Sequence, residues 1–433
     1  MPCLLRSVTA KLLLCLCLAG GLALIAHAAP APVNFDPVAE TEKLLNTLPA
    51  EARAKSDAYF EGGYVIQVWN LVLGLVIAWG LLRFGVPQKL RDIAERRFQG
   101  RFLQGVLFLA MFTVVSAIID LPNDYYVGFI REHRFGLSNL STGGWIGEQL
   151  KGLLVGVIIG SLIGSLLYLA IKRSPDRWWV HASLATPFLM LFLMVLAPVY
   201  FLPLFNRYTP LADAKVRDPI LAMARANGVP ADNVWQFDAS KQTKRISANV
   251  SGALNTVRIS LNDNLLNRCT PAEIQAVMAH ELGHYVLNHV YRRVIYFSLL
   301  ICAGFWFTHW FYGRAVRQWG AAWGLRGITD FAGLPVLMAG FSLFMFLATP
   351  ISNSITRTAE QEADYYGLNA ARQPDGFATT ALKLSEYRKL KPGPWEELVF
   401  FTHPSGYTRI LTAMRWKAEH LDEGVSVKGP TKE

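Results

Sequence analysis

Six apolar segments of membrane-spanning length constrain this chain more than any other feature. They cover residues 63–82, 102–119, 153–171, 184–202, 294–311 and 331–348, and segment 102–119 is the weakest. About 20 apolar residues suffice for a transmembrane helix. The chain is 52% hydrophobic and only 17% charged, whereas soluble domains carry about 25% charged residues. We therefore expect an α-helical polytopic membrane protein with six or seven transmembrane helices and membrane lipid as a partner.

The seventh helix depends on how residues 1–28 are interpreted. Arg6 and Lys11 precede the apolar run LLLCLCLAGGLALIA, and small residues follow up to Ala28. This is the pattern of a signal peptide. The alternative is a first transmembrane helix that is retained.

The net charge and the cysteines argue against a nucleic-acid partner and against a metal site built from cysteine. A net charge of +10 is expected when Lys and Arg gather in cytoplasmic loops, and no basic run is long enough to follow a nucleic-acid backbone. We expect no nucleic-acid partner. The five cysteines show neither a disulfide framework nor zinc-binding spacing. Any metal must therefore be bound by histidine and carboxylate.

The apolar segments divide the chain into regions. Residues 29–202 form an N-terminal transmembrane region, and residues 291–350 hold the last two spans. The polar pieces 203–290 and 351–433 flank that pair, so both must lie on the same side of the membrane. Within the first piece, KRISANVSGALNTVRISLND has two β-rich runs around the turn SGALN, which predicts a β-hairpin.

The stretch MAHELGHYVLNH carries the chemistry. Thr270, followed by Pro and by Glu273, predicts a capped helix start. On that helix His280 and His284 lie one turn apart and face the same way, so both can bind one Zn²⁺. Glu281 is placed to take the proton of an attacking water, which is the HExxH arrangement of metallopeptidases.

A catalytic zinc ion needs a third protein ligand. His289 does not have the spacing of a third metzincin ligand. In SITRTAEQEADYYG, Glu360 and Asp364 share a helix face and Glu362 lies on another. This pair is either a ligand with an aspartate that hydrogen-bonds a ligand histidine, or a solvated helix face.

At these motifs the chain resembles the type I CAAX prenyl proteases, integral-membrane zinc endopeptidases of the gluzincin group. HELGHYVLNH resembles their zinc helix, and RTAEQEAD resembles their E-x-x-A-D segment. The resemblance implies that Glu360 is the third ligand and Asp364 its partner behind the metal. SANVSG resembles an edge strand on which Asn249 contacts substrate backbone, and THPSGYTRI resembles a segment that brings His403 and Arg409 to the site.

The same resemblance implies a gluzincin domain at one end of a water-filled chamber enclosed by seven helices. It also implies a lipid-modified or membrane-associated peptide or protein substrate with a CAAX box, and a zinc site open to the cytosol. The signal-like start departs from the family, which has a transmembrane helix there.

The leading hypothesis is a zinc endopeptidase in which Glu281 is the general base, His403 or Arg409 donates to the oxyanion and Asn249 pairs with substrate backbone. The rivals are a heat-shock-type quality-control peptidase of the membrane, and a non-catalytic scaffold or transporter. A structural zinc site is usually closed by a fourth ligand, but Cys269 lies about three turns from His280. The spans carry almost none of the ionisable residues that a transporter needs.

Alternate loops are basic, which predicts the orientation. The basic residues after segments 63–82 and 153–171 and between the last two spans are Arg83, Lys89, Arg91, Arg96, Arg97, Arg101, Lys172, Arg173, Arg177, Arg314, Arg317 and Arg326. Such loops stay cytoplasmic. The zinc helix is then expected on the periplasmic face of a bacterial inner membrane.

Overall fold

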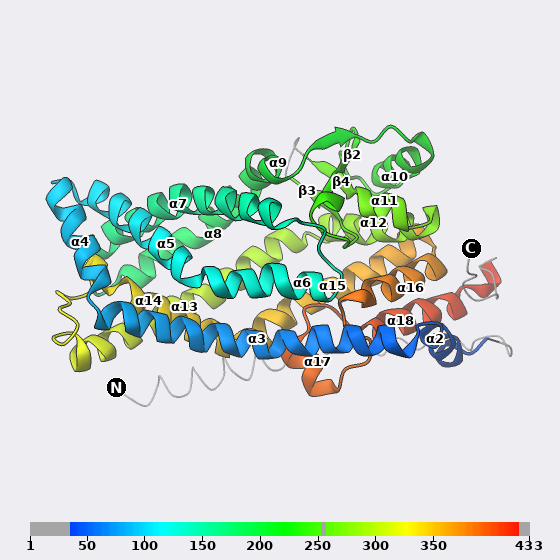
Figure 1. Cartoon of the computed structure of the whole chain (residues 1–433). Helices are drawn as coiled ribbons and strands as arrows, with labels where there is room; N and C mark the ends of the chain where they lie inside the picture. Colours follow the sequence, from blue (N-terminus) through cyan, green and yellow to red (C-terminus); the bar gives the residue numbers. More distant parts are fainter. Residues whose placement is uncertain (1–34, 253–256, 424–433) are drawn as a thin grey trace, which may run out of the picture.

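A computed structural model describes residues 35–252 and 257–423. Figure 1 shows an elongated, mostly helical molecule with a long bundle at one end and a small sheet with shorter helices toward the other. The polytopic helical fold expected from the sequence is confirmed. The predicted signal peptide, residues 1–28, lies outside the described residues.

Four helical stretches in the described chain are long and apolar enough to cross a membrane, or five if one bent pair counts as a span. They are α3 (Ala50–Arg83), α5 (Arg101–Tyr125) continued by a π-turn (Tyr126–Ile130) and α6 (Arg131–Arg134), α7 (Thr142–Arg173) and α13 (His289–Trp319). The bent pair is a 3₁₀ turn (Phe331–Gly333) and α14 (Leu334–Leu347) with α15 (Thr349–Ala371), which meet at 55°.

The structure refines two expectations about the spans. Segment 102–119, taken as the weakest, lies within one of the four full-length apolar stretches. Segment 184–202 begins in α8 (Trp178–Leu196), whose apolar portion, Trp178–Met194, is by itself shorter than a span. The helix changes there to a π-turn (Ala197–Phe201) and to α9 (Leu202–Phe205), at prolines that cannot donate backbone hydrogen bonds. The large central chamber remains a prediction.

The far end of the bundle, away from the sheet, is closed by α4 (Val86–Arg97). Arg91 on α4 donates to Asp330 across 2.7 Å, and both side chains are buried. This ion pair connects α4 to the loop between α13 and α14. The same end holds an apolar cluster that joins Ile171 and Trp178 to Ala94, so the loop between α7 and α8 lies there too.

The predicted hairpin is confirmed as the antiparallel pair β3 (Ala248–Ser251) and β4 (Arg258–Asn262). With β1 (Tyr208–Pro210) and β2 (Val234–Phe237) they form a sheet of order β1-β2-β4-β3, in which β3 is the edge strand. One face of the sheet packs on α10 (Ala214–Ala226) and α12 (Pro271–Val286). The short helix α11 (Asp263–Arg268) connects β4 to α12.

The two polar pieces of the chain pack directly on each other. Helix α12 contacts both α15 and α16 (Pro374–Lys383), and α18 (Gly406–Glu419) packs on α16 and on α2 (Pro37–Leu45). Helix α17 (Pro394–Phe400) contacts α15. Residues far apart in sequence are thereby gathered around α12.

Candidate active site

Helix α12 positions the two motif histidines. Its first turn has the predicted capping box, in which Thr270 and Glu273 satisfy each other's backbone N–H groups. From this start, His280 and His284 project from the same face one turn apart. Their Nε2 atoms lie 3.2 Å from each other.

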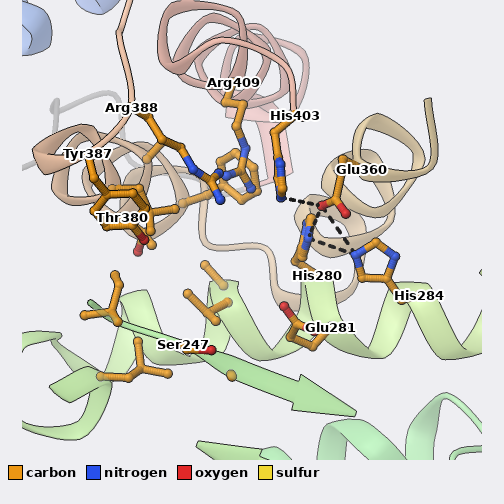
Figure 2. Close-up of a pocket in the computed structure, with 18 of the residues that line it drawn as sticks. Ser247, His280, Glu281, His284, Glu360, Thr380, Tyr387, Arg388, His403 and Arg409 are labelled. Carbon is orange, nitrogen blue, oxygen red and sulfur yellow. Dashed lines mark hydrogen bonds and ion pairs between the residues drawn. The ribbon is translucent and has the colours of Figure 1, made fainter. Parts of the chain in front are cut away.

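Helix α15 brings Glu360 to the same point. Its Oε2 lies 3.2 Å from Nε2 of His280 and 3.5 Å from Nε2 of His284. Figure 2 shows the three side chains converging, with His403 approaching from the opposite side. One donor atom from each of His280, His284 and Glu360 lies within 4.8 Å of the others. Of the two interpretations of the Glu360–Asp364 pair, the solvated helix face is wrong, because both residues are buried.

This donor set fits a divalent metal. Two imidazole nitrogens 3.2 Å apart repel through their lone pairs unless a proton or a cation lies between them. A carboxylate oxygen completes a set of two nitrogens and one oxygen. That is a ligand combination of catalytic zinc sites, which keep one position open.

A glycine permits the close approach of α12 and α15. A Cβ atom on Gly367 would lie 2.9 Å from the backbone nitrogen of His280, so only glycine fits. A Cβ atom on Gly283 of α12 would lie 3.0 Å from a ring carbon of Tyr366. Sequence spacing alone did not reveal this contact, although a glycine three residues after Asp364 is a usable signal of close helix packing.

Asp364 and Arg409 support His280 from behind. Nδ1 of His280 lies 2.8 Å from Oδ1 of Asp364, and Arg409 donates to the two oxygens of that carboxylate from Nε and Nη2, at 2.9 and 2.7 Å. Burial disfavours a charge on His280, but the carboxylates of Asp364 and Glu360 outweigh it and raise its pKa to about 9. The site therefore attracts positive charge at the point where a metal would bind.

Glu281 faces a pocket beside this cluster. The pocket has a volume of about 280 Å³ and is also lined by His280, Glu360 and His403. Burial raises the pKa of Glu281 to about 7, and a nearby divalent cation would lower it again. With a cation bound, Glu281 would therefore be deprotonated near neutral pH and able to accept a proton.

His403 and Arg409 reach the pocket in different ways. Nε2 of His403 lies 3.3 Å from Oε2 of Glu360, and its Nδ1 lies 2.9 Å from the hydroxyl of Thr402. Burial, aided by the charge of Arg388, lowers the pKa of His403 to about 3, so the ring is neutral. Arg409 also lines the pocket, but two of its nitrogens are already bonded to Asp364.

Asn249 lies on the edge strand β3 and pairs with Ser260 of β4. Its neighbours Ser247 and Ala248 line the pocket, whereas Asn249 is not among the lining residues. Its predicted contact with substrate backbone remains a prediction.

Arg388, which the sequence did not single out, points into the pocket (Figure 2). Its guanidinium carbon lies 5.7 Å from the ring centre of Tyr387. Within residues 35–252 and 257–423 the guanidinium has no hydrogen-bond or ion-pair partner. It is therefore available to an anionic group that enters the pocket.

Comparison with known proteins establishes the family. Residues 210–417 match peptidase family M48, and residues 37–207 match the CAAX prenyl protease N-terminal region of five membrane helices. The uncharacterised metalloprotease YhfN of Bacillus subtilis is 32% identical, covering 81% of this chain and 84% of its own. The chain belongs to peptidase family M48.

Other relatives support the assignment of this chain to peptidase family M48. CAAX prenyl protease 1 of Saccharomyces cerevisiae is 29% identical, covering 82% of this chain and 78% of its own. The crystal structure of S. mikatae Ste24p has the same fold, with a TM-score of 0.71 at 23% identity over 87% of this chain and 94% of that one. The resemblance inferred from the motifs is confirmed. The chain is a multi-pass membrane metalloendopeptidase that acts on peptide or protein substrates.

Two further residues of this M48 peptidase escaped sequence reasoning. Arg293, at the start of α13, donates to Oε1 of Glu360 across 2.8 Å. His289 was set aside because it lacks the spacing of a metal ligand, yet its Nδ1 lies 2.9 Å from Nδ1 of His284. The signal was a histidine five residues beyond the motif.

Proposed function

We propose that this chain is a zinc endopeptidase whose ion is held by His280, His284 and Glu360. The convergence of these three donors on one point carries the proposal. Zinc bound there would supply Lewis acidity, polarising a scissile carbonyl and lowering the pKa of a water molecule. Arg293 holds the second oxygen of Glu360 and thereby orients the first oxygen toward the two histidines.

Glu281 is the general base in this proposal. It takes the proton of the attacking water and returns it to the leaving amine. Its support is its place in the pocket, one residue from the proposed ligand His280. General-base catalysis contributes about 10²–10⁴-fold in rate.

His403 is the better donor to the developing oxyanion. The Thr402 hydroxyl can donate to its Nδ1, which leaves the ring proton on Nε2, facing the cluster. Arg409 has its Nε and Nη2 committed to Asp364. We therefore assign Arg409 to holding Asp364, and through it the ring of His280.

The substrate peptide binds by strand addition along β3. The amide of Asn262 donates to the carbonyl of Ser247, so by antiparallel alternation residues 247, 249 and 251 bond toward β4. The backbone groups of Ala248 and Val250 then face the open edge. Asn249 can meet the substrate only through its side chain.

The substrate is proposed to be lipid-modified, by analogy with the relatives named CAAX prenyl protease 1. Cleavage of a farnesylated CAAX peptide would be compared with cleavage of the same peptide without the lipid. A preference of at least about tenfold in kcat/KM, or 1.4 kcal/mol, supports a prenyl substrate. Equal rates on both peptides and on an unfolded protein favour the quality-control peptidase.

The site is proposed to face the periplasm of a bacterial inner membrane. Figure 1 shows α4 and the loop between α13 and α14 at the end of the molecule away from α12 and the sheet. These are basic loops, which stay cytoplasmic. Alkaline phosphatase and green fluorescent protein fused after Glu433 test this. Active phosphatase supports the proposal, and a fluorescent fusion with inactive phosphatase restores the cytosolic site implied by the family.

The ligand set is tested by metal analysis of the purified protein. We expect one zinc ion per chain in the wild type and loss of peptide cleavage on chelation, restored by added zinc. A protein that cleaves peptides with no bound metal would overturn the proposal.

A further inference from the structure

The turn between α12 and α13 places His289 against His284, one of the three proposed metal ligands. Helix α12 ends at Val286, and Asn288 adopts the left-handed conformation with φ 55° and ψ 33°. Asparagine tolerates this conformation better than most residues. The turn reverses the chain so that His289, the first residue of α13, points back at His284. Its side chain is 1% exposed.

Both ring nitrogens of His289 are engaged. Nδ1 faces Nδ1 of His284 at 2.9 Å, and Nε2 lies 2.9 Å from Oε2 of Glu362. Arg292 in turn donates to both oxygens of Glu362, at 2.5 and 3.2 Å. His289 is therefore no fourth metal ligand, because neither nitrogen is left for an ion.

The hydrogen bonds of a metal-binding His284 determine which ring nitrogens of His284 and His289 carry a proton. Two ring nitrogens 2.9 Å apart need one proton between them. A metal-binding His284 keeps Nε2 free of a proton, so its Nδ1 carries the hydrogen and donates. His289 then accepts at Nδ1 and carries its own hydrogen on Nε2, which donates to the Glu362 carboxylate. The tautomer of His284 thus determines the tautomer of His289.

We propose that His289 is a positioning residue that holds His284 in its metal-binding tautomer and orientation, with Glu362 and Arg292 behind it. The inference rests on the proposed function, which makes His284 a ligand. It gives His284 the support that Asp364 and Arg409 give His280. Each proposed ligand is then connected to its own arginine: Glu360 directly to Arg293, His280 through Asp364 to Arg409, and His284 through His289 and Glu362 to Arg292.

The test compares two substitutions of His289 by zinc affinity, measured by chelator competition on the purified full-length protein. In His289→Asn, the Oδ1 atom replaces Nδ1 as the acceptor for His284. His289→Leu removes the acceptor. Loss of a hydrogen-bonding partner behind a metal ligand weakens affinity by about 10–100-fold. We expect that loss in the Leu variant and affinity within about threefold of wild type in the Asn variant.

Two control measurements separate the possible causes of a change in zinc affinity. Thermal unfolding of the metal-free proteins measures any purely structural effect, and Glu360→Ala tests the ligand set itself. If Glu360→Ala retains zinc, the proposed function fails. If Glu360→Ala loses zinc while His289→Leu binds it as tightly as wild type, only the present inference fails. Equal loss of affinity in the Asn and Leu variants also overturns it.

Glu362→Gln provides a second route if His289→Leu does not fold. The side chain of Glu362 is 36% exposed, so the substitution disturbs little packing. It removes the charge that accepts from His289 while keeping a similar shape. Zinc affinity at least about fivefold weaker than wild type supports the relay, and unchanged affinity overturns it.

Discussion

Replacing Gly367 by alanine should separate the two helices that build the metal site. The added Cβ would lie 2.9 Å from the backbone nitrogen and 3.1 Å from the Cα of His280. Backbone atoms cannot rotate out of the way. Restoring ordinary contacts of about 3.5–4.0 Å requires α15 to move away from α12 by about 0.6–1.1 Å.

The cost in stability is modest, and the cost in function is large. Overpacking a well-packed contact costs about 1–3 kcal/mol, and replacing a mid-helix glycine by alanine returns about 0.5–1 kcal/mol. The net destabilisation is roughly 0–2.5 kcal/mol. The same shift carries Glu360 and Asp364 away from His280, and a misplacement of about 1 Å can lower the rate about 10²-fold.

The assay pairs kcat/KM on a peptide with zinc affinity, and Gly160→Ala on α7 is the matched control. Gly160 also lies within a helix, but a Cβ atom added there would meet no other part of the described chain within 4 Å beyond the backbone of its own helix. We expect Gly160→Ala to behave as wild type. If Gly367→Ala keeps wild-type kcat/KM and zinc affinity, α12 and α15 do not pack as described.

Three further outcomes are expected. Glu360→Ala should lose bound zinc, whereas Glu362→Ala should still fill with zinc at saturating concentration; equal metal content in both would move the third ligand elsewhere. Arg388→Gln should lower kcat/KM about tenfold for peptides with a carboxylate near the cleavage site, since a hydrogen bond to a charged group contributes about 1.5 kcal/mol or more, and an equal effect on amidated peptides would contradict this. Asn249→Ala should slow turnover at unchanged zinc content, and an unchanged rate on several peptides would make Asn249 ordinary strand surface.

Local patterns predicted the elements of the site well. The Thr270 capping box, the one-turn spacing of His280 and His284, and the shared face of Glu360 and Asp364 all follow from helix geometry within a single segment. The hairpin likewise follows from alternation around a turn.

Contacts between segments could not be predicted in the same way. His289 reaches His284 only because Asn288 adopts a left-handed conformation, and Arg388 enters the pocket from the segment between α16 and α17. The bonds between Arg409 and Asp364 likewise depend on how α18 docks. Residue types and spacing do not encode such docking.

The most direct test of the account is Glu281→Gln, with zinc content and peptide cleavage measured on the same preparation. The substitution removes the proposed base but no proposed ligand. We expect one zinc ion per chain, as in the wild type, and cleavage below about one per cent of the wild-type rate, within the 10²–10⁴-fold range of general-base catalysis. Cleavage near the wild-type rate by the zinc-loaded variant would contradict the account.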